Sequence, residues 1–446
     1  MISSISLKPM TGKSAFRRFD RGSMVNSRSL IQQAIADLPN SDAPDLDARW
    51  LLAHLLQIDH RDPKLHRDFP IDEGIAEKFR RYVTRRASGE PLAHLLGEWE
   101  FYGHTFEVTS NDSGFFKKFV NLVKFLIASK FKTGSINYLP ISMDIEPTTG
   151  CNFRCTMCQV SLPDFAAKNM DLETFKKVID DNPQLLKIKL QGMGETLVQT
   201  QIFDMMNYAK SHGIVTETTT NGSLFNKKNI ELLKANKVSK ITVSIDGATK
   251  STFESIRVDS NFDTVIKGAS LLVEQCNKNL LRPQISAWCV LQKSNYHEIF
   301  KVFDLCRKIG FDDLTFQIQL SSWGQDYWVD KNKSMQINFN AEQVQEDFEK
   351  IRNLGKKNNF NVRIFEENTL NFNKQCQWPF RSSYVSVDGS VVPCAPISDP
   401  KVVTMGNIKE TSYEKIWKSK TYDKLRDNIR KNNLDDYCKD CSREYR

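Results

Sequence analysis

The sequence lacks the features that would place it among membrane, secreted or nucleic-acid-binding proteins. It has no run of 18 or more apolar residues, so no membrane-spanning helix is expected. It also has no secretory leader, so we expect a cytoplasmic protein whose ten cysteines serve metals rather than disulfides. The formal net charge is +8, but the basic residues are dispersed without interleaved aromatics, so no specific nucleic-acid partner is expected.

The composition that is present indicates a folded chain with several domains. Hydrophobic residues make up 40% and charged residues 26% of the sequence, and a length of 446 residues predicts about three domains. Residues 1–23 differ, because they are rich in Ser, Lys and Arg and contain no acid before Asp20. We expect them to be a disordered leader or extension. A transit peptide and an extension before a start at Met24 both fit, and we favour the extension.

Three cysteines lie within eight residues, at Cys151, Cys155 and Cys158. An iron–sulfur cluster that only carries electrons is held by four thiolates. No fourth cysteine is near in the sequence, so a cluster on these three would keep one iron open to a ligand from outside the protein. The alternative is zinc, which usually takes four ligands, often in paired CxxC units. The CxxxCxxC spacing therefore favours an iron–sulfur cluster at which chemistry takes place.

Strand and helix signals alternate between residues 141 and 318. Short apolar runs predict six strands, at 141–145, 186–190, 214–219, 241–245, 284–291 and 314–318. Helices are expected between them, one beginning behind a capping Asp171 and others at 201–212, 262–278 and 296–309. Such alternation is typical of parallel βα units, so the predicted fold class is α/β.

Small and polar residues follow several of these strands. They are Gly192, Gly194 and Glu195 after the second strand, Asn221 after the third, Ser244 and Asp246 at the end of the fourth, and Arg257 near the next helix. Taken singly, each is more often a turn former or a helix cap. Because barrels of parallel strands place ligands at the carboxyl ends of their strands, the set together predicts a binding site.

With these residues behind its CxxxCxxC motif, the chain from about 136 to 441 resembles the radical S-adenosylmethionine (SAM) superfamily. The resemblance implies a partial (βα)6, TIM-like barrel. It also implies that Cys151, Cys155 and Cys158 ligate a [4Fe-4S] cluster, with SAM on the fourth iron. Met157 stands where the family has an apolar residue before the last cysteine. In this family the reduced cluster cleaves SAM to a 5'-deoxyadenosyl radical, which abstracts hydrogen from a substrate carbon.

The same resemblance implies which residues contact SAM. Gly192, Gly194 and Glu195 match the glycine-rich element whose backbone approaches the SAM amino group. Asn221, Ser244, Asp246 and Arg257 match the polar positions at later strand ends, with Arg257 at a position that often binds the SAM carboxylate. Gln317, Gln319 and Trp323 follow the last predicted strand, and we expect them to line the substrate space.

A second group of cysteines lies near the C-terminus. It comprises Cys376, Cys394, Cys438 and Cys441, and a hairpin is expected between the first two, from Trp378-Pro379-Phe380 and from the Asp388-Gly389 turn. The spacing resembles the one-cluster, twitch version of the SPASM extension found on radical SAM enzymes. The resemblance implies an auxiliary [4Fe-4S] cluster, and four protein ligands would close it and favour electron transfer. A structural zinc ribbon is the alternative. Cys276, Cys289 and Cys306 lie in apolar patterns and are expected in the core.

The N-terminal region has a different character. Helical periodicity runs from Ser29 to Arg86, and the segments 47–54 and 85–103 resemble the N-terminal domain of release-factor glutamine methyltransferases. The resemblance ends at about Thr109, and no Rossmann-like glycine fingerprint or Asn-Pro-Pro-Tyr motif follows. Glutamine methylation by that family's mechanism is therefore not expected. The domain is a recruiting module with a release-factor-like protein as its partner, a relic of a gene fusion, or the product of a joined gene model, and we expect it to make no catalytic contribution.

Together these observations predict five segments and an enzyme. The segments are 1–23, an all-α helical domain at 24–110, a linker helix at 111–135, the barrel at 136–370 and a small iron–sulfur domain at 371–446. The linker helix, between Phe115 and Phe131, carries four lysines and is expected to pack on the barrel rather than on a membrane.

The expected reaction is hydrogen abstraction from a peptide, a protein or a sugar-like alcohol, followed by loss of a second electron to the auxiliary cluster. Epimerisation and methylthiolation remain alternatives within the enzyme class. A flavodoxin or ferredoxin is the expected reducing partner. From a different class, a non-catalytic iron–sulfur adaptor that binds a release factor through residues 24–109 is the competing hypothesis.

Overall fold

The structure is a computed structural model, and it describes residues 25–439. The gaps are residues 40, 42, 57, 59, 61, 91, 97, 102–103, 108–112, 132–135, 278–281 and 366–375. The segment 1–23 and Cys441 therefore lie outside the described residues. The chain forms two compact units, Met1–Leu96 and Gly97–Arg446, which are described separately below.

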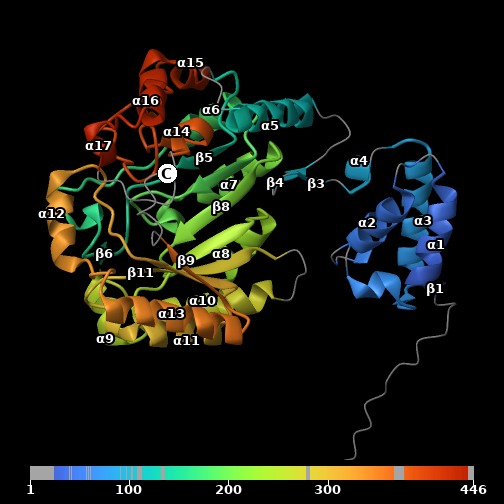
Figure 1. Ribbon diagram of the computed structural model, residues 1–446, viewed down its shortest axis with the longest axis horizontal. Coiled ribbons are helices and arrows are strands. Elements are labelled where there is room, and N and C mark those ends of the chain that lie inside the picture. The colour runs from blue at the N-terminus through green and yellow to red at the C-terminus, as the bar shows by residue number, and fades with distance from the viewer. Residues whose placement is uncertain are drawn as a thin grey trace, which may run out of the picture. The chain divides into compact units, whose positions relative to one another are not determined.

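The first unit is a small helical assembly (Figure 1). Its helices are α1 (Ser27–Asp37), α2 (Pro44–Leu56), α3 (Glu73–Ala87) and α4 (Leu92–Leu96). A 3-10 turn η1 (Pro63–His66) and a short antiparallel pair, β1 (Val25–Asn26) with β2 (Pro70–Ile71), complete it. Apolar residues at helical spacing, such as Leu30, Ala34 and Leu51, are buried between the helices. The helical signal from Ser29 to Arg86 is thus confirmed.

The second unit is built on a sheet that contains all six predicted strands, side by side and parallel. They are β5 (Ser142–Ile145), β7 (Lys187–Leu190), β8 (Val215–Thr220), β9 (Lys240–Ser244), β11 (Gln284–Val290) and β12 (Asp313–Gln317). Helices connect them: α6 (Leu172–Asp180), α7 (Ile202–Ser211), α8 (Lys227–Ala235), α9 (Lys250–Ile256), α10 (Phe262–Cys276) and α11 (Ile299–Ile309). Asp171 caps α6 by accepting a hydrogen bond from the Thr174 amide, as expected. The α/β class and the partial barrel are confirmed.

The sheet extends beyond the six predicted strands at both edges. At one edge β13 (Asn361–Phe365) pairs in parallel with β12, after helices α12 (Asp326–Met335) and α13 (Glu342–Lys357). At the other edge β14 (Tyr384–Val385) pairs in parallel with β5, and β15 (Ser390–Val392) and β16 (Gly406–Asn407) follow. The ten-stranded order is β13-β12-β11-β9-β8-β7-β5-β14-β15-β16. The C-terminal segment is therefore continuous with the barrel sheet.

The two faces of the parallel sheet differ in chemistry. Alternate residues such as Ile145, Leu190 and Val243 are fully buried in the core that includes the helices. The opposite face carries a row of charged residues at matching register on four neighbouring strands, namely Asp144, Lys189, Glu217 and Lys240. Because their charges alternate in sign across the sheet, neighbouring side chains attract one another.

The hairpin predicted near the first C-terminal cysteine is confirmed in part. Strands β14 and β15 pair around the Asp388-Gly389 turn, and Gly389 has φ of +87°, which favours glycine. Trp378 and Pro379 do not belong to the hairpin, contrary to the prediction. They form a helical turn, α14 (Trp378–Arg381), because Pro379 at its start supplies a helical φ without losing a backbone hydrogen bond.

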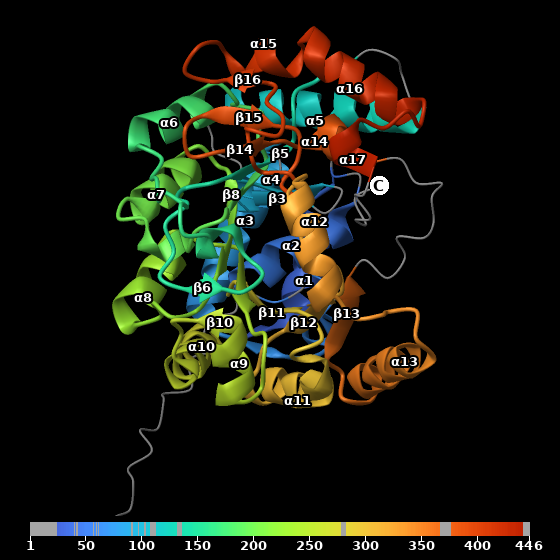
Figure 2. The same ribbon diagram turned by 90° about the vertical axis from the view of Figure 1, so that its left-hand side faces the viewer.

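The remaining elements pack around these. C-terminal helices α15 (Tyr413–Trp417), α16 (Lys420–Arg430) and α17 (Asp436–Lys439) lie on the β14 side of the sheet in both ribbon views (Figure 2). Short elements complete the unit: β3 (Glu98–Phe101) paired with β4 (His104–Glu107), β6 (Arg154–Cys155) paired with β10 (Arg257–Val258), and the 3-10 turns η2 (Gln159–Ser161), η3 (Thr196–Val198) and η4 (Tyr296–Glu298).

The predicted linker helix is α5 (Ser113–Phe131), and it packs on the barrel as expected. Leu122 is fully buried against Ile141 and Leu186, and the Lys118 ammonium donates to the His212 carbonyl at 2.8 Å. Among the residues that the structure describes, no helix is long and apolar enough to cross a membrane.

Candidate functional site

A cavity of about 220 Å3 opens where the parallel strands end. The predicted site residues that line it are Cys151, Cys155, Met157, Cys158, Gly192, Gly194, Glu195, Asn221, Ser244, Arg257, Gln317 and Trp323. Two predicted residues, Asp246 and Gln319, are not among the lining residues. The fold therefore brings residues that are up to 172 positions apart in the sequence, Cys151 and Trp323, to one cavity.

The cysteine loop enters this cavity directly after β5. Cys155 lies on β6, whose pairing with β10 places it opposite Arg257. The Arg257 guanidinium donates to the Cys155 sulfur at 3.8 Å, and the Phe153 amide donates to the Cys151 sulfur at 3.4 Å. These donors stabilise thiolates, which are the form of cysteine that binds metals.

Burial works against those thiolates when no metal is bound. It raises the pKa of Cys155 to about 12 and that of Cys158 to about 11, and it raises the pKa of Cys151 as well. The positive charge of Arg257 lowers all three values by a smaller amount. A buried, electron-rich set of thiols beside one fixed cation suits an iron–sulfur cluster, whose irons supply the missing positive charge.

A single-ion site is not formed by the described part of the chain, in which no group of three or more His, Cys, Asp or Glu side chains could hold a metal ion. A four-iron cluster also needs its thiolates around one space, but farther apart than the ligands of a single ion, because each thiolate binds a different iron.

Arg257 is held in place by Asp246. The two side chains form an ion pair of 2.7 Å, with Arg257 7% and Asp246 0% exposed. Asp246 also accepts a hydrogen bond from the Val290 amide at 2.7 Å. Asp246 thus lies behind Arg257 rather than on the cavity wall. The Arg257 Nε atom is buried without a hydrogen-bond partner among the described residues, so the guanidinium retains donor capacity.

The glycine loop after β7 packs against the chain that leads into the cysteine loop. The Gly194 amide donates to the Thr148 carbonyl at 3.2 Å, and the Glu195 amide donates to the Gly150 carbonyl at 2.9 Å. A Cβ atom on Gly194 would lie 2.6 Å from the Thr148 oxygen, so any larger residue would push the two loops apart. Glycine at this position therefore allows the two loops to pack closely.

Glu195 joins the glycine loop to the end of β8. Its carboxylate accepts from the Thr220 hydroxyl at 2.6 Å, from the Asn221 amide at 2.6 Å and from the Leu197 amide at 3.1 Å. Burial raises its pKa, and these hydrogen bonds oppose that rise. The carboxylate borders the cavity with its geometry fixed, so it is prepared to accept from a cationic group of a ligand.

Asn221 connects this wall to the cysteine loop. Its side-chain amide donates to the Asn152 side chain at 2.9 Å, and Asn152 is the residue after Cys151. Sequence reasoning missed Asn152, and it also missed Gln191 and Thr219, which line the cavity and are joined by a 3.1 Å hydrogen bond. Both precede predicted site residues by one or two positions, so extending each strand-end motif by two residues would have found them.

The C-terminal cysteines lie in the extension of the sheet. Cys394 follows β15, and Cys438 lies on α17. Both are partly buried, and each shares an apolar cluster with Tyr437. Burial, then Asp435 and Cys438, and then Cys394 raise the pKa of Tyr437, which places both thiols near one phenol. Cys376 is also partly buried, and Cys441 lies outside the described residues. Cys276, Cys289 and Cys306 are buried in the core.

Three family models match the chain, each over a different segment. Residues 145–282 match the radical SAM superfamily, residues 376–442 match the iron–sulfur cluster-binding SPASM domain, and residues 29–97 match the PrmC N-terminal domain. The first two segments contain the cysteine loop and the C-terminal cysteines, respectively.

Curated relatives match the same segments. An AdoMet-dependent heme synthase of Methanosarcina barkeri is 26% identical over 301 residues, 63% of this chain and 83% of the relative. The antilisterial bacteriocin subtilosin biosynthesis protein AlbA of Bacillus subtilis is 26% identical over 293 residues, 64% of this chain and 61% of AlbA. A release factor glutamine methyltransferase of Nitratidesulfovibrio vulgaris is 43% identical over 67 residues, 15% of this chain and 23% of the relative.

Among solved structures, Streptococcus suis SuiB bound to S-adenosylmethionine has a similar fold. The two share 15% sequence identity with a TM-score of 0.52, over 84% of this chain and 82% of SuiB. At this identity the likeness concerns the fold.

The barrel and the cysteine-lined cavity thus define an iron–sulfur enzyme whose residues 145–282 belong to the radical SAM superfamily. More particularly, this radical SAM segment is followed by a segment, residues 376–442, that matches the SPASM domain, and it is preceded by a segment, residues 29–97, that matches the PrmC N-terminal domain. The radical SAM domain of the chain binds a [4Fe-4S] cluster and SAM, and its SPASM domain binds auxiliary iron–sulfur clusters.

Proposed function

We propose that this chain oxidises a carbon of a peptide, a protein or a sugar-like alcohol, and that Cys151, Cys155 and Cys158 hold the catalytic [4Fe-4S] cluster. The observation that carries the proposal is the cavity that these three thiols share with the glycine loop and Arg257. When bound there, the cluster and SAM supply a 5'-deoxyadenosyl radical, which removes a hydrogen atom from the substrate.

The residues around the cavity fit that pair of cofactors. Arg257 has an unused buried donor and a fixed position beside Cys155, which suits the carboxylate of SAM. Glu195 is a fixed acceptor on the opposite loop, which suits its amino group. Gly192 and Gly194 leave the loop backbone open to a close ligand. Met157, Asn221 and Ser244 complete the proposed wall, and Asp246 positions Arg257 from behind.

The second electron of the oxidation is proposed to leave through one auxiliary cluster on Cys376, Cys394, Cys438 and Cys441. Four thiolates saturate a cluster, so it cannot bind the substrate through iron and is suited to electron transfer. A peptide or protein is the substrate class that we favour, because AlbA is named for the biosynthesis of the bacteriocin subtilosin. The heme synthase keeps a small-molecule substrate as the second candidate.

Partners and location are proposed on the same basis. Flavodoxin or ferredoxin would deliver the electron that starts each turnover. The proposed location of the protein is the cytoplasm. The first unit would recruit a release-factor-like protein, because its residues 29–97 match the PrmC N-terminal domain. The relatives of the barrel are named for biosynthetic roles, which do not support a non-catalytic adaptor.

Anaerobic reconstitution tests the proposal. The wild-type protein, given dithionite and SAM, is expected to form 5'-deoxyadenosine, detected by mass spectrometry. Cys158→Ala is expected to form none, and Cys276→Ala, which changes a core thiol, is the matched control with wild-type yield. The proposal fails if the wild type forms no 5'-deoxyadenosine while its four-iron clusters are spectroscopically intact.

A further inference from the structure

Glu146, the residue after β5, is a buried carboxylate to which the proposed function gives no task. It is 3% exposed and accepts one backbone hydrogen bond with each of its oxygens. Oε1 accepts from the Met193 amide at 2.9 Å, and Oε2 accepts from the Val387 amide at 3.3 Å. The two donors are 194 residues apart in the sequence, so one side chain links two distant segments.

The first of these segments is the glycine wall of the cavity, residues 192–194. All three of its residues line the cavity. A Cβ atom on Gly192 would lie 2.6 Å from Oε1 of Glu146, so the loop backbone and the carboxylate are in direct contact. A ligand that presses on this wall therefore also presses on Glu146.

The second segment is the β14–β15 turn, residues 386–390, which begins the C-terminal extension of the sheet. Glu146 reaches it at the end of the β5–β14 ladder, where its own amide donates to the Val385 carbonyl at 2.9 Å. Its carboxylate adds the next link, to Val387. Cys394 follows β15 by two residues, so the turn leads directly into the segment that carries the proposed auxiliary-cluster ligands.

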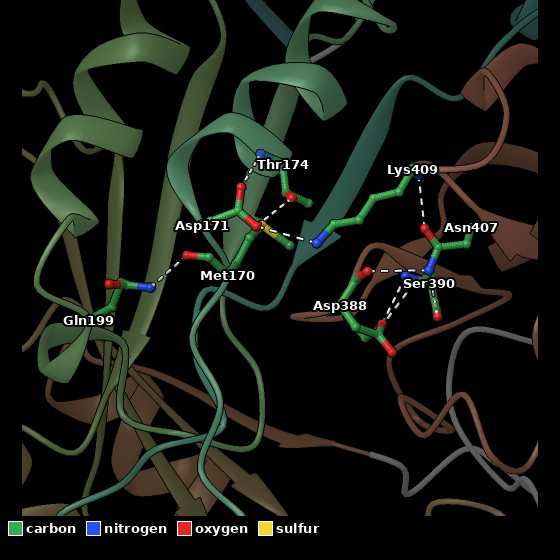
Figure 3. A network of polar contacts seen from close by, with 9 residues as sticks. Met170, Asp171, Thr174, Gln199, Asp388, Ser390, Asn407 and Lys409 are labelled. Atoms are coloured by element: carbon green, nitrogen blue, oxygen red, sulfur yellow. Dashed lines mark hydrogen bonds and ion pairs between the residues drawn. The ribbon is translucent and has the colours of Figure 1, made fainter.

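The turn is held by contacts within itself and with β16. Asp388 accepts from the Ser390 amide at 3.0 Å, and the Asn407 side chain donates to the Asp388 carbonyl at 3.2 Å (Figure 3). Two residues after Asn407, the Lys409 ammonium lies 3.3 Å from the carboxylate of Asp171 at the start of α6. These contacts do not involve Glu146, so they hold the turn together when the link from Glu146 is altered.

We propose that Glu146 is a positioning residue that couples the glycine wall of the cofactor cavity to the C-terminal cluster-binding segment. SAM binding at the wall then orders the 386–390 turn through the two hydrogen bonds of one carboxylate. This rests on the proposed function, because SAM is the ligand taken to contact the wall. The coupling would make the C-terminal segment sensitive to whether the catalytic cavity is filled.

The substitution Glu146→Gln isolates this link. A glutamine has one acceptor oxygen where glutamate has two, and its NH2 group would face one of the two backbone N–H donors. One link must therefore break, although size and shape are kept. Glu146→Asp is a second variant, because its carboxylate is one methylene shorter and cannot span both donors.

Glu298 offers a matched control. It is 2% exposed and, like Glu146, accepts from two backbone amides, those of Ala248 at 2.8 Å and Thr249 at 3.2 Å. Neither of these amides belongs to the glycine wall or the turn. Both amides donate to Oε2 of Glu298, and Oε1 accepts from the Thr249 hydroxyl at 2.6 Å, so a glutamine oxygen can keep both backbone links. Glu298→Gln therefore makes the same chemical change in a buried acid at a place without the proposed coupling.

Hydrogen–deuterium exchange of the reconstituted, full-length holoprotein, with and without SAM, measures the coupling directly. In the wild type and in Glu298→Gln, SAM is expected to slow exchange about threefold or more in peptides covering both 190–195 and 385–392. In Glu146→Gln and Glu146→Asp, the slowing is expected to remain at 190–195 and to disappear at 385–392.

The outcomes separate this inference from the proposed function. If SAM slows exchange at 190–195 of the wild type but not at 385–392, the coupling is absent and the inference is wrong. It is also wrong if either Glu146 variant keeps the slowing at 385–392, or if Glu298→Gln loses it. If SAM changes neither peptide in the wild type, SAM does not bind at the wall and the proposed function itself fails.

Discussion

The two groups of cysteines in this chain are built in opposite ways. Cys151, Cys155 and Cys158 lie within eight residues on one loop, and the fold adds Arg257 and the glycine wall around them. The C-terminal group is spread in the sequence from Cys376 to Cys441, and a helical turn, a hairpin and further helices lie between its first and last members. In our proposal the compact group leaves one iron of its cluster without a protein ligand, whereas the dispersed group supplies all four ligands of its cluster. The difference teaches that the site left open for chemistry is the one whose ligands depend least on the distant parts of the fold.

The largest expected effect comes from removing one thiol of each group. Cys155→Ala is expected to lose about four irons per chain and all SAM cleavage, because two thiolates do not retain a four-iron cluster. Cys394→Ala is expected to lose a similar amount of iron but to keep SAM cleavage without substrate. Iron analysis together with 5'-deoxyadenosine yield distinguishes the two. Equal loss of cleavage in both variants would remove the distinction between the groups.

A smaller effect is expected from the cation beside the compact group. Arg257→Met leaves Asp246 as a buried, unpaired carboxylate, so the protein is expected to lose about 3–5 kcal/mol of stability and the cysteine loop to bind iron weakly. The double variant Arg257→Met with Asp246→Leu is the control, and it is expected to recover stability but not SAM binding. Thermal unfolding and SAM affinity measure the two effects. Recovery of SAM binding in the double variant would contradict a ligand contact by Arg257.

Glu146, which lies between the cofactor cavity and the C-terminal segment, is expected to make the stability of the protein depend on pH. Burial raises the pKa of Glu146 from 4.5 to about 7, against the hydrogen bonds from the Met193 and Val387 amides and the influence of the nearby Tyr384 hydroxyl, and Asp388 raises it further. A folded pKa above the unfolded one means that the folded state favours the proton. Stability from this group is therefore complete below about pH 4.5 and is lost as the pH rises through 7, by about 3 kcal/mol at most.

Glu146→Gln is expected to remove that loss, so its melting temperature should fall less than that of the wild type between pH 5 and pH 8. Glu298 behaves oppositely, because its pKa is lowered; burial opposes this shift, but hydrogen bonds from Thr249, Ala248 and Thr252 outweigh it. Its contribution is lost as the pH falls, so Glu298→Gln should change the acid side instead. Circular dichroism melts of the wild type and both variants as a function of pH check these signs. If the melting temperatures of Glu146→Gln and of the wild type fall equally between pH 5 and pH 8, Glu146 does not titrate in this range.

The smallest effect on SAM cleavage is expected from removing the first unit. A chain beginning at residue 97 is expected to cleave SAM within about twofold of the full-length rate, because every residue that lines the cavity belongs to the second unit. Comparing 5'-deoxyadenosine yields at equal cluster content measures this. A tenfold loss would assign the first unit a part in catalysis.

Local patterns explain which parts of the fold were predictable. The six central strands are short apolar runs between turns, and their order followed from the βα alternation. β13 was missed because Asn361 and Arg363 interrupt its apolar residues. The hairpin of β14 and β15 was expected from its turn, but the pairing of β14 with β5 was not. Pairing between segments 240 residues apart leaves no local signal.

The site was predictable to a similar extent. The cysteine loop and the glycine loop have short spacings, and the cavity contains them both. The position of Asp246 behind Arg257 could not be predicted, because the pairing of β6 with β10 turns the arginine towards the loop. Glu146 gave no signal either. In the sequence it is an acid before a proline, and only the fold brings Val387 to its carboxylate. The boundaries of the five segments and the roles of the single site residues stay predictions.

Mössbauer spectroscopy of Cys394→Ala, reconstituted with 57Fe, tests the central claim most directly, because the cysteine loop would then hold the remaining cluster. We expect a four-iron cluster in which one iron changes its spectrum when SAM is added, as an iron without a protein ligand must. Zinc in place of iron at that loop, or a cluster that is unchanged by saturating SAM, would contradict the account.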